Sequence, residues 1–208
     1  MIVFCQYAAR NSTTYHLSSP CLSAPHQPHL WRRILVRPSS TLTEFHQTIV
    51  CAFGWADVHP HRFLIRGCSF AGSNASEAAP RLSEFQFRLG ERFFYDLRFQ
   101  DGQTLAWRHQ IRLEKIVEAE GAVSFPRCTE GRGSPPLDQV SNPAELADLS
   151  ELFTPRYIVH RLAELVGQDS DDRRIAQELR HLRPWFDMKT FRFREANQRL
   201  GRQIGARP

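Results

Sequence analysis

Six positions of the chain carry side chains that could do polar chemistry. They are His46, His59, Asp101, His109, Cys128 and Asp138. Imidazole, carboxylate and thiolate groups are suitable ligands for a transition metal, so their convergence would allow a metal-assisted enzyme. No two of them have the spacing of a chelating pair such as H-x-x-x-H, and an inward-pointing histidine also fits a core where it hydrogen-bonds a carbonyl or carboxylate. We therefore predict no cofactor, with a transition metal as the alternative.

A helix positions the first of these histidines. The segment 41–53 begins with Thr41-x-x-Glu44, a capping box in which the threonine hydroxyl and the glutamate carboxylate each accept an orphan backbone N–H. Apolar residues follow at helical spacing, and Gly54 stands where a left-handed cap would end the helix. The pattern predicts a helix over 41–53, with His46 at the border of its apolar face.

Alternating polar and apolar residues predict the strands around this helix. Strands are expected at residues 31–37, 61–66, 91–99 and 105–117. In the last strand, His109 shares the inward face with Trp107 and Ile111. Asp101-Gly102 precedes that strand and predicts a hairpin turn. The fold class is α+β: an antiparallel sheet with one packed N-terminal helix and a C-terminal helical cluster.

Composition divides the chain into three parts. These are an irregular leader at 1–27 with one short strand at Ile2–Tyr7, an α+β core at 28–140, and a helical C-terminal extension of the same domain at 141–208. Glycine, proline and small polar residues predict loops at 68–79 and 125–140. Helices are expected at 144–153, 155–166, 171–182 and 188–200. Asp187 is placed to cap the last of these helices.

Five strings spread along the chain form a recognisable pattern. They are Trp31-Arg-Arg-Ile-Leu-Val36, Thr41-Leu-x-x-Phe-His46, Ala52-Phe-Gly-Trp55, Trp107-Arg-His109 and Pro135-Pro-Leu-Asp138. Over residues 28–200 the chain resembles the plasmid pRiA4b ORF-3-like family. The resemblance implies a small α+β protein of plasmids, transposons or bacterial chromosomes, whose members include some labelled as transposon resolvase-like passengers. It implies no established activity.

The resemblance also enlarges the set of candidate residues. It adds three aromatic positions, so the candidate pocket comprises His46, Trp55, His59, Tyr95, Asp101, Trp107, His109, Cys128 and Asp138. One departure from the family pattern is Leu137, which stands where the family has an acidic residue. This loss argues against acid-dependent chemistry in this chain.

The charge of the chain is carried almost entirely by arginine. The 208 residues have a formal net charge of +5, with 25 arginines against only Lys115 and Lys189. Arginine forms the planar, bidentate fork that recognises phosphate, although a GC-rich coding sequence produces the same bias. Aromatic residues alternate with arginine in Phe191-Arg-Phe-Arg194, a pattern that suits stacked bases and phosphates. The candidate nucleic-acid contacts are Arg108, Arg112, Arg192, Arg194 and Arg199.

Other function classes lack their signals. No apolar stretch approaches the ~18 residues that span a bilayer. The five cysteines are scattered without a C-x-x-C pair, which favours reduced thiols in a cytoplasm. We therefore predict a cytoplasmic accessory protein of a plasmid or transposon that binds nucleic acid or a nucleoprotein partner without catalysis. The alternatives are a metal-assisted or His/Asp-dependent enzyme and a protein-interaction module. The tail arginines also fit ordinary exposed helices on which they form solvated ion pairs.

Overall fold

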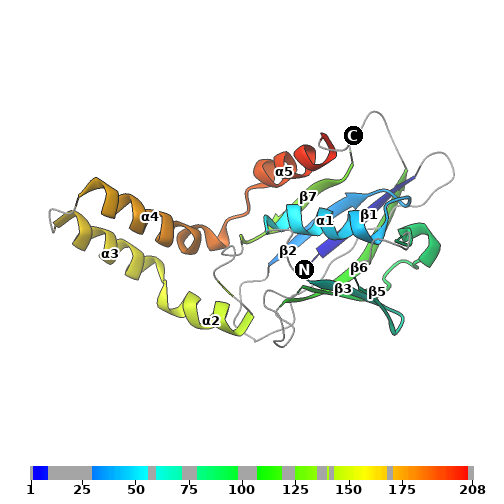
Figure 1. Cartoon of the computed structure of the whole chain (residues 1–208), viewed down its shortest axis with the longest axis horizontal. Coiled ribbons are helices and arrows are strands. Elements are labelled where there is room, and N and C mark those ends of the chain that lie inside the picture. Colours follow the sequence, from blue (N-terminus) through cyan, green and yellow to red (C-terminus); the bar gives the residue numbers. More distant parts are fainter. Residues whose placement is uncertain are drawn as a thin grey trace.

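The computed structural model is built around one seven-stranded sheet (Figure 1). It describes residues 2–8, 30–55, 60–71, 79–97, 107–118, 125–134, 140, 143–167 and 171–205. The strands are β1 (Ile2–Ala8), β2 (Trp31–Val36), β3 (His61–Ile65), β4 (Cys68–Ala71), β5 (Arg92–Leu97), β6 (Trp107–Glu118) and β7 (Arg127–Arg132). The helices are α1 (Leu42–Phe53), α2 (Pro143–Leu152), α3 (Pro155–Gly167), α4 (Asp172–Phe186) and α5 (Phe193–Gly205), with short 3-10 turns η1 (Leu82–Phe85) and η2 (Asp187–Lys189).

The strand order is β4-β3-β5-β6-β1-β2-β7, and it confirms the α+β class. The first strand, β1, lies in the interior of the sheet and is parallel to both of its neighbours, β6 and β2. Every other strand pair that the structure describes is antiparallel. The short strand expected at Ile2–Tyr7 is therefore present, and it joins the two halves of the sheet.

Helix α1 has the ends that its residues predict. The Thr41 hydroxyl accepts the Glu44 N–H at 3.1 Å, and the Glu44 carboxylate accepts the Thr41 N–H at 3.1 Å. Gly54 ends the helix with φ +78°, a left-handed conformation that costs glycine little. The apolar face of α1 packs on the sheet, where Phe45 and Ile49 are completely buried. Burial of each such side chain contributes about 1.5–3 kcal/mol.

The C-terminal helices form two parts. We call the α3–α4 hairpin the arm, and α5 lies separately against the sheet. Helices α3 and α4 make a hairpin that projects away from the sheet (Figure 1) and is joined by an Arg161–Glu178 ion pair. The base of the hairpin returns to the main core, because Leu182 and Trp185 are buried in the same cluster as the sheet residues. Helix α5 packs beside β7 and the end of α1, with Ala196 buried at that contact.

Three local predictions were wrong. The predicted loops at 68–79 and 125–140 contain the strands β4 and β7, which are polar because they lie at the two edges of the sheet. Asp187 begins the turn η2 instead of capping α5, because α4 continues through Pro184 to Phe186. The predicted pairing of the strands around Asp101-Gly102 is confirmed, although the turn itself lies outside the described residues.

Candidate functional site

Four side chains from α1, β3, β5 and β6 meet beneath α1. They form the histidine cluster, which we define as His46, His61, Tyr95 and His109. His46 Nδ1 and the Tyr95 hydroxyl are 2.7 Å apart, a strong hydrogen bond between buried groups. The His46 and His61 rings lie parallel with their centroids 3.4 Å apart, and the Tyr95 and His109 ring centroids are 5.6 Å apart.

His109 is the most deeply buried histidine of the cluster. It is 2% exposed and makes edge contacts with Phe53 and Trp55. Burial lowers the pKa of this imidazole to about 3, because the charged form has little solvation there. His109 is therefore neutral at physiological pH.

Five of the nine candidate pocket residues lie close together. They are His46, Trp55, Tyr95, Trp107 and His109. His59, Asp101 and Asp138 lie outside the described residues. Cys128 lies elsewhere, on β7, where it packs with Ala196. His61 was not among the candidate residues, yet it stacks on His46; its position two residues from Phe63, on the same face of the strand, was the signal for this.

The candidate metal ligands that the structure describes do not gather into a metal-binding group. The part of the chain that the structure describes contains no group of three His, Cys, Asp or Glu side chains that could hold a metal ion. Burial raises the pKa of the Cys128 thiol to about 11, so the thiol stays protonated and donates to the Glu130 carbonyl at 3.3 Å. Within the histidine cluster, the described hydrogen bond joins His46 to Tyr95, whereas His109 Nδ1 is buried without a described partner.

A second polar site lies at the C-terminal end of α1, and its centre is Arg32. This side chain points inward from β2 and is only 1% exposed. Its guanidinium is stacked between Phe53 and Phe191, with its carbon 4.6 Å and 4.1 Å from the two ring centroids. Gly131 permits this stack, because a Cβ there would lie 2.8 Å from the Phe191 ring. Sequence reasoning missed Arg32, although it lies two residues from Ile34 and therefore shares the inward face of β2 with that apolar residue.

Backbone carbonyls satisfy most of the Arg32 donors. Nε donates to the Ala52 carbonyl at 3.1 Å, and the two terminal nitrogens donate to the carbonyls of Trp31, Arg132 and Gly133 at 2.8–2.9 Å. Among the described residues, no carboxylate forms an ion pair with Arg32. Burial lowers its pKa to about 9, so the group remains a cation at pH 7. Within the described ranges, Arg32 is thus a buried charge without a carboxylate partner.

Arg199 of α5 brings a second cation to the same helix end. Its Nε donates to the Cys51 carbonyl at 2.8 Å, and its guanidinium lies over Gly54, where an added Cβ would be 3.1 Å from the guanidinium carbon. The partial negative charge at a helix C-terminus favours cations, and α1 has no basic residue in its own last turn. Arg32 and Arg199 therefore supply, from outside the helix, the positive charges and hydrogen-bond donors for the last carbonyls of α1.

A cavity of about 220 Å³ opens beside these two arginines. We call it the arginine pocket, and its lining includes Arg32, Phe53, Gly54, Arg183, Asp187, Phe191, Arg192, Glu195 and Arg199. At its rim, Asp187 pairs with Arg192 at 2.9 Å and with Arg183 at 3.6 Å. Four arginines against two carboxylates leave the lining positively charged.

Comparison with known proteins places these residues in a family. The family model described as plasmid pRiA4b ORF-3-like protein matches residues 23–195. The chain belongs to this family. The region matched to the pRiA4b ORF-3-like model contains the whole histidine cluster and Arg32, but it ends before Arg199 and does not include β1. The resemblance noted in the sequence is thus confirmed.

Two relatives extend this result. The uncharacterized protein y4hQ of Sinorhizobium fredii is 27% identical to the chain over 125 residues, which cover 56% of this chain and 62% of that protein. The match therefore spans less than two thirds of y4hQ. The crystal structure of a protein of unknown function, MM3350 from Methanosarcina mazei Go1, covers 88% of this chain at a TM-score of 0.61 and 23% identity, with 96% of that chain covered. This family member therefore shares its fold with MM3350.

The predicted nucleic-acid contacts of this family member occupy two surfaces. Arg192, Arg194 and Arg199 lie at or on α5, whereas Arg108 and Arg112 lie on the sheet face opposite α1. On that sheet face, the buried Asp96 carboxylate accepts both Nε and Nη2 of Arg108 at 2.7 and 3.1 Å, and Nε of Arg62 at 2.9 Å. Burial raises the pKa of Asp96, but the two arginines outweigh burial and hold the pKa below its usual value.

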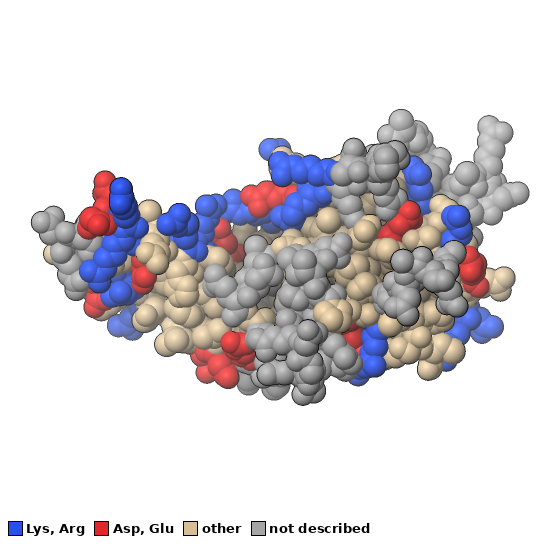
Figure 2. Space-filling view, in the orientation of Figure 1, with Lys and Arg blue, Asp and Glu red and all other residues tan. Residues whose placement is uncertain are grey.

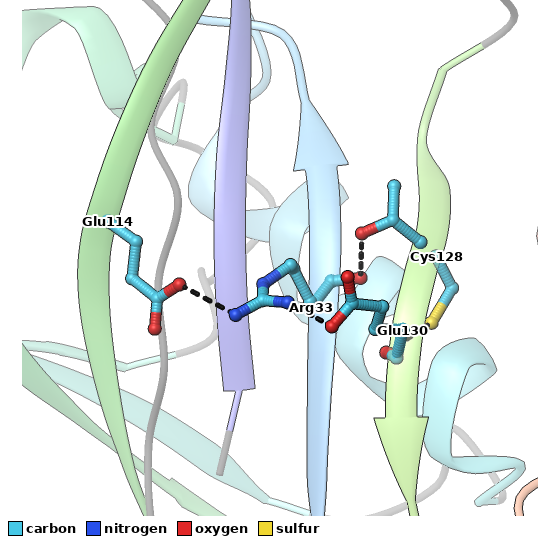
Figure 3. A network of polar contacts seen from close by, with 5 residues as sticks. Arg33, Glu114, Cys128 and Glu130 are labelled. Carbon is cyan, nitrogen blue, oxygen red and sulfur yellow. Dashed lines mark hydrogen bonds and ion pairs between the residues drawn. The ribbon is translucent and has the colours of Figure 1, made fainter.

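A second ion-pair network ties the same sheet face together. Arg33 of β2 reaches Glu114 of β6 at 3.2 Å and also contacts Glu130 of β7 (Figure 3). The side chain therefore spans β1, which lies between β2 and β6. On this face, carboxylates therefore engage Arg33, Arg62 and Arg108. Arg112 has no carboxylate partner among the described residues.

No helix in the ranges described by the structure is long and apolar enough to cross a membrane.

Proposed function

We propose that this chain binds nucleic acid, alone or within a nucleoprotein complex, without catalysing a reaction. The binding surface is the α4–α5 surface, defined as the exposed side chains of residues 180–202. The observation that carries the proposal is its charge: this segment has seven basic and two acidic residues, a formal charge of +5, which equals the net charge of the whole chain. Lys and Arg side chains follow α4 and α5 along one edge of the molecule in Figure 2.

The ion pairs of this surface engage only some of its basic side chains, so the others remain available to contact phosphate groups. Asp187 and Glu195 engage Arg183 and Arg192. Arg180, Lys189, Arg194 and Arg202 are exposed, and none of them pairs with a carboxylate among the described residues. Unpaired arginine and lysine side chains neutralise phosphates and release counterions, which is the main source of sequence-independent affinity.

Aromatic side chains and hollows accompany these charges. Phe186 is 58% exposed and Phe193 is 39% exposed, so both rings are accessible for stacking against bases. A hollow of about 430 Å³ lies between β7 and α5 and is lined in part by Arg127, Phe193 and Arg194. The arginine pocket lies on the other side of α5. Aromatic rings beside cationic hollows suit single-stranded nucleic acid better than duplex.

The non-catalytic part of the proposal rests on the histidine cluster and the buried thiol. His109 is neutral and enclosed by aromatic rings, and Cys128 is held as a protonated thiol. Neither group is suited to act as a general base or nucleophile at neutral pH. An accessory role beside a plasmid or transposon, in a cytoplasm, is part of the same proposal and is supported by the family name alone.

Fluorescence anisotropy with a labelled single-stranded oligonucleotide tests the binding. With four phosphate contacts, we expect affinity to fall about fiftyfold between about 50 mM and about 200 mM salt. Arg180→Glu combined with Arg194→Glu should weaken binding and flatten the salt slope by about one per removed contact. The control is Arg88→Glu, since Arg88 is exposed beyond η1 and its described hydrogen bonds use its backbone N–H and carbonyl, not its side chain. Undetectable binding, or equal weakening by the control, would overturn the proposal.

A second candidate function is favoured by the exposed face of the arm. Val159 of α3 is 61% exposed, Val166 is 73% exposed, and Leu179 of α4 is 44% exposed. Apolar side chains grouped on a projecting element are typical of a surface that binds another protein. Cross-linking through a photoreactive group at Val159, compared with one at the exposed Leu89 beyond η1, tests this function: equal labelling at both positions contradicts it.

A further inference from the structure

The arginine pocket contains a buried cation that pairs with no carboxylate among the residues the structure describes. Arg32 is 1% exposed and all its described hydrogen bonds go to neutral carbonyls. Taking a charge out of water is costly unless an opposite charge accompanies it. Arg199 adds a second positive charge, and its described hydrogen bonds also go only to carbonyls, those of Cys51 and Ala52. An anion in the adjoining cavity would supply the missing counter-charge.

Donors for such an anion remain in the pocket. The guanidinium of Arg199 uses Nε and Nη2 for its described hydrogen bonds, which leaves Nη1 without a partner among the described residues. Arg32 Nη2 carries two hydrogens and donates one described hydrogen bond, to the Gly133 carbonyl. Arg192 stands at the rim, where Asp187 holds one side of its guanidinium. Two guanidinium groups fixed in place thus retain donors beside the same cavity.

The floor of the pocket is rigid. Phe53 and Phe191 hold the plane of the Arg32 guanidinium between them, and Gly131 leaves room for the stack. The carbonyl acceptors come from the end of α1, from β2, and from the last residue of β7 with the glycine that follows it. A donor set that is already ordered loses little entropy when a ligand binds.

We propose that the arginine pocket is a binding site for a phosphate group, either as a free phosphate or as a phosphodiester of nucleic acid. A cavity of about 220 Å³ has room for a tetrahedral oxyanion with ordered water. Several guanidinium donors match an anion with more than two acceptor oxygens, and arginine binds phosphate with the bidentate geometry that lysine lacks. The phosphodiester form deepens the proposed nucleic-acid function and rests on it, whereas the free-phosphate form does not.

Titration of the 15N-labelled chain with inorganic phosphate tests the site. Arginine side-chain Nε–H signals are followed while sodium chloride keeps the ionic strength constant, and acetate serves as the comparison anion. We expect saturable shifts with phosphate that acetate does not reproduce. Arg199→Gln should weaken phosphate binding about tenfold, because it removes a charged hydrogen-bond donor. Arg192→Gln, at the rim, should weaken it less and serves as a second variant if Arg199→Gln does not fold.

Arg194→Gln is the matched control, because Arg194 lies on the same helix but lines the other hollow. It should leave phosphate binding unchanged while weakening binding of the oligonucleotide. Phosphate binding that is absent, that acetate reproduces, or that Arg194→Gln and Arg199→Gln weaken equally overturns the site. In that case, salt-sensitive oligonucleotide binding that depends on Arg180 and Arg194 would still support the proposed function. Phosphate binding without oligonucleotide binding would support the free-phosphate form and overturn the proposed function alone.

Discussion

The imidazole of His109 links the stability of this protein to pH. The ordinary pKa of histidine is about 6.5 in an unfolded chain, and burial lowers the pKa of His109 to about 3 in the folded state. Between these values the unfolded chain binds a proton that the folded chain does not. The contribution of His109 to stability is therefore fully present above about pH 6.5 and is lost progressively as the pH falls toward 3.

This linkage predicts a pH-dependent difference between two variants. From pH 7.5 to pH 5, His109 should account for a fall of about 2 kcal/mol in the free energy of unfolding. In His109→Gln that part of the fall should vanish, even though the variant is less stable at every pH. Urea denaturation at several pH values measures the effect. His160→Gln is the control, because the His160 side chain is 74% exposed; an unchanged pH slope in His109→Gln would contradict the prediction.

At the scale of secondary structure, an element could be predicted where its own residues carry the signal, and was missed where contacts with other strands determine its conformation. Helix α1 was predictable because its capping box and its C-terminal glycine are local signals. Strands β5 and β6 were predictable because apolar residues recur at every second position along each of them, although Asp96 on the other face of β5 is also buried. Strands β4 and β7 were missed because, at the sheet edges, neighbouring strands rather than an apolar pattern determine that they are extended.

The capping box of α1 has a measurable energetic role. Thr41→Ala removes the hydroxyl that accepts the Glu44 N–H and should lower the free energy of unfolding by about 1 kcal/mol. Thr43→Ala is the matched control: this threonine is exposed within α1, so the same change should be neutral or slightly stabilising. Thermal and urea unfolding of both variants provide the measurement, and equal effects would show that the cap contributes nothing.

At the scale of the whole molecule, both candidate sites depend on contacts between distant parts of the chain. In the arginine pocket, Arg32 of β2 stacks on Phe191, which precedes α5. In the histidine cluster, His46 of α1 stacks on His61 of β3. The sequence indicates that the family's histidines and tryptophans point inward, but no local pattern says which of them touch. That is why the candidate residues could be proposed only as a group, while Arg32 and His61 were missed.

Because β1 lies inside the sheet, residues 2–8 hold the two halves of the sheet together. Because β1 pairs with β6 on one side and β2 on the other, its removal separates β4-β3-β5-β6 from β2-β7. A chain that begins at residue 9 would expose two unpaired strand edges, whose backbone groups need partners. We expect this variant to lose cooperative urea unfolding and the near-ultraviolet circular dichroism of its packed tryptophans.

A peptide of residues 1–8 added in trans tests whether this loss is specific to β1. Both neighbours of β1 are parallel to it, so the peptide must enter with a single orientation to satisfy both edges. Recovery of the tryptophan signal, saturating with peptide concentration, is the expected result, and a peptide of the same composition in scrambled order is the control. If the shortened chain instead unfolds cooperatively at the midpoint of the full chain, β1 is dispensable, and the strand cannot be what joins the histidine cluster and the arginine pocket into one fold.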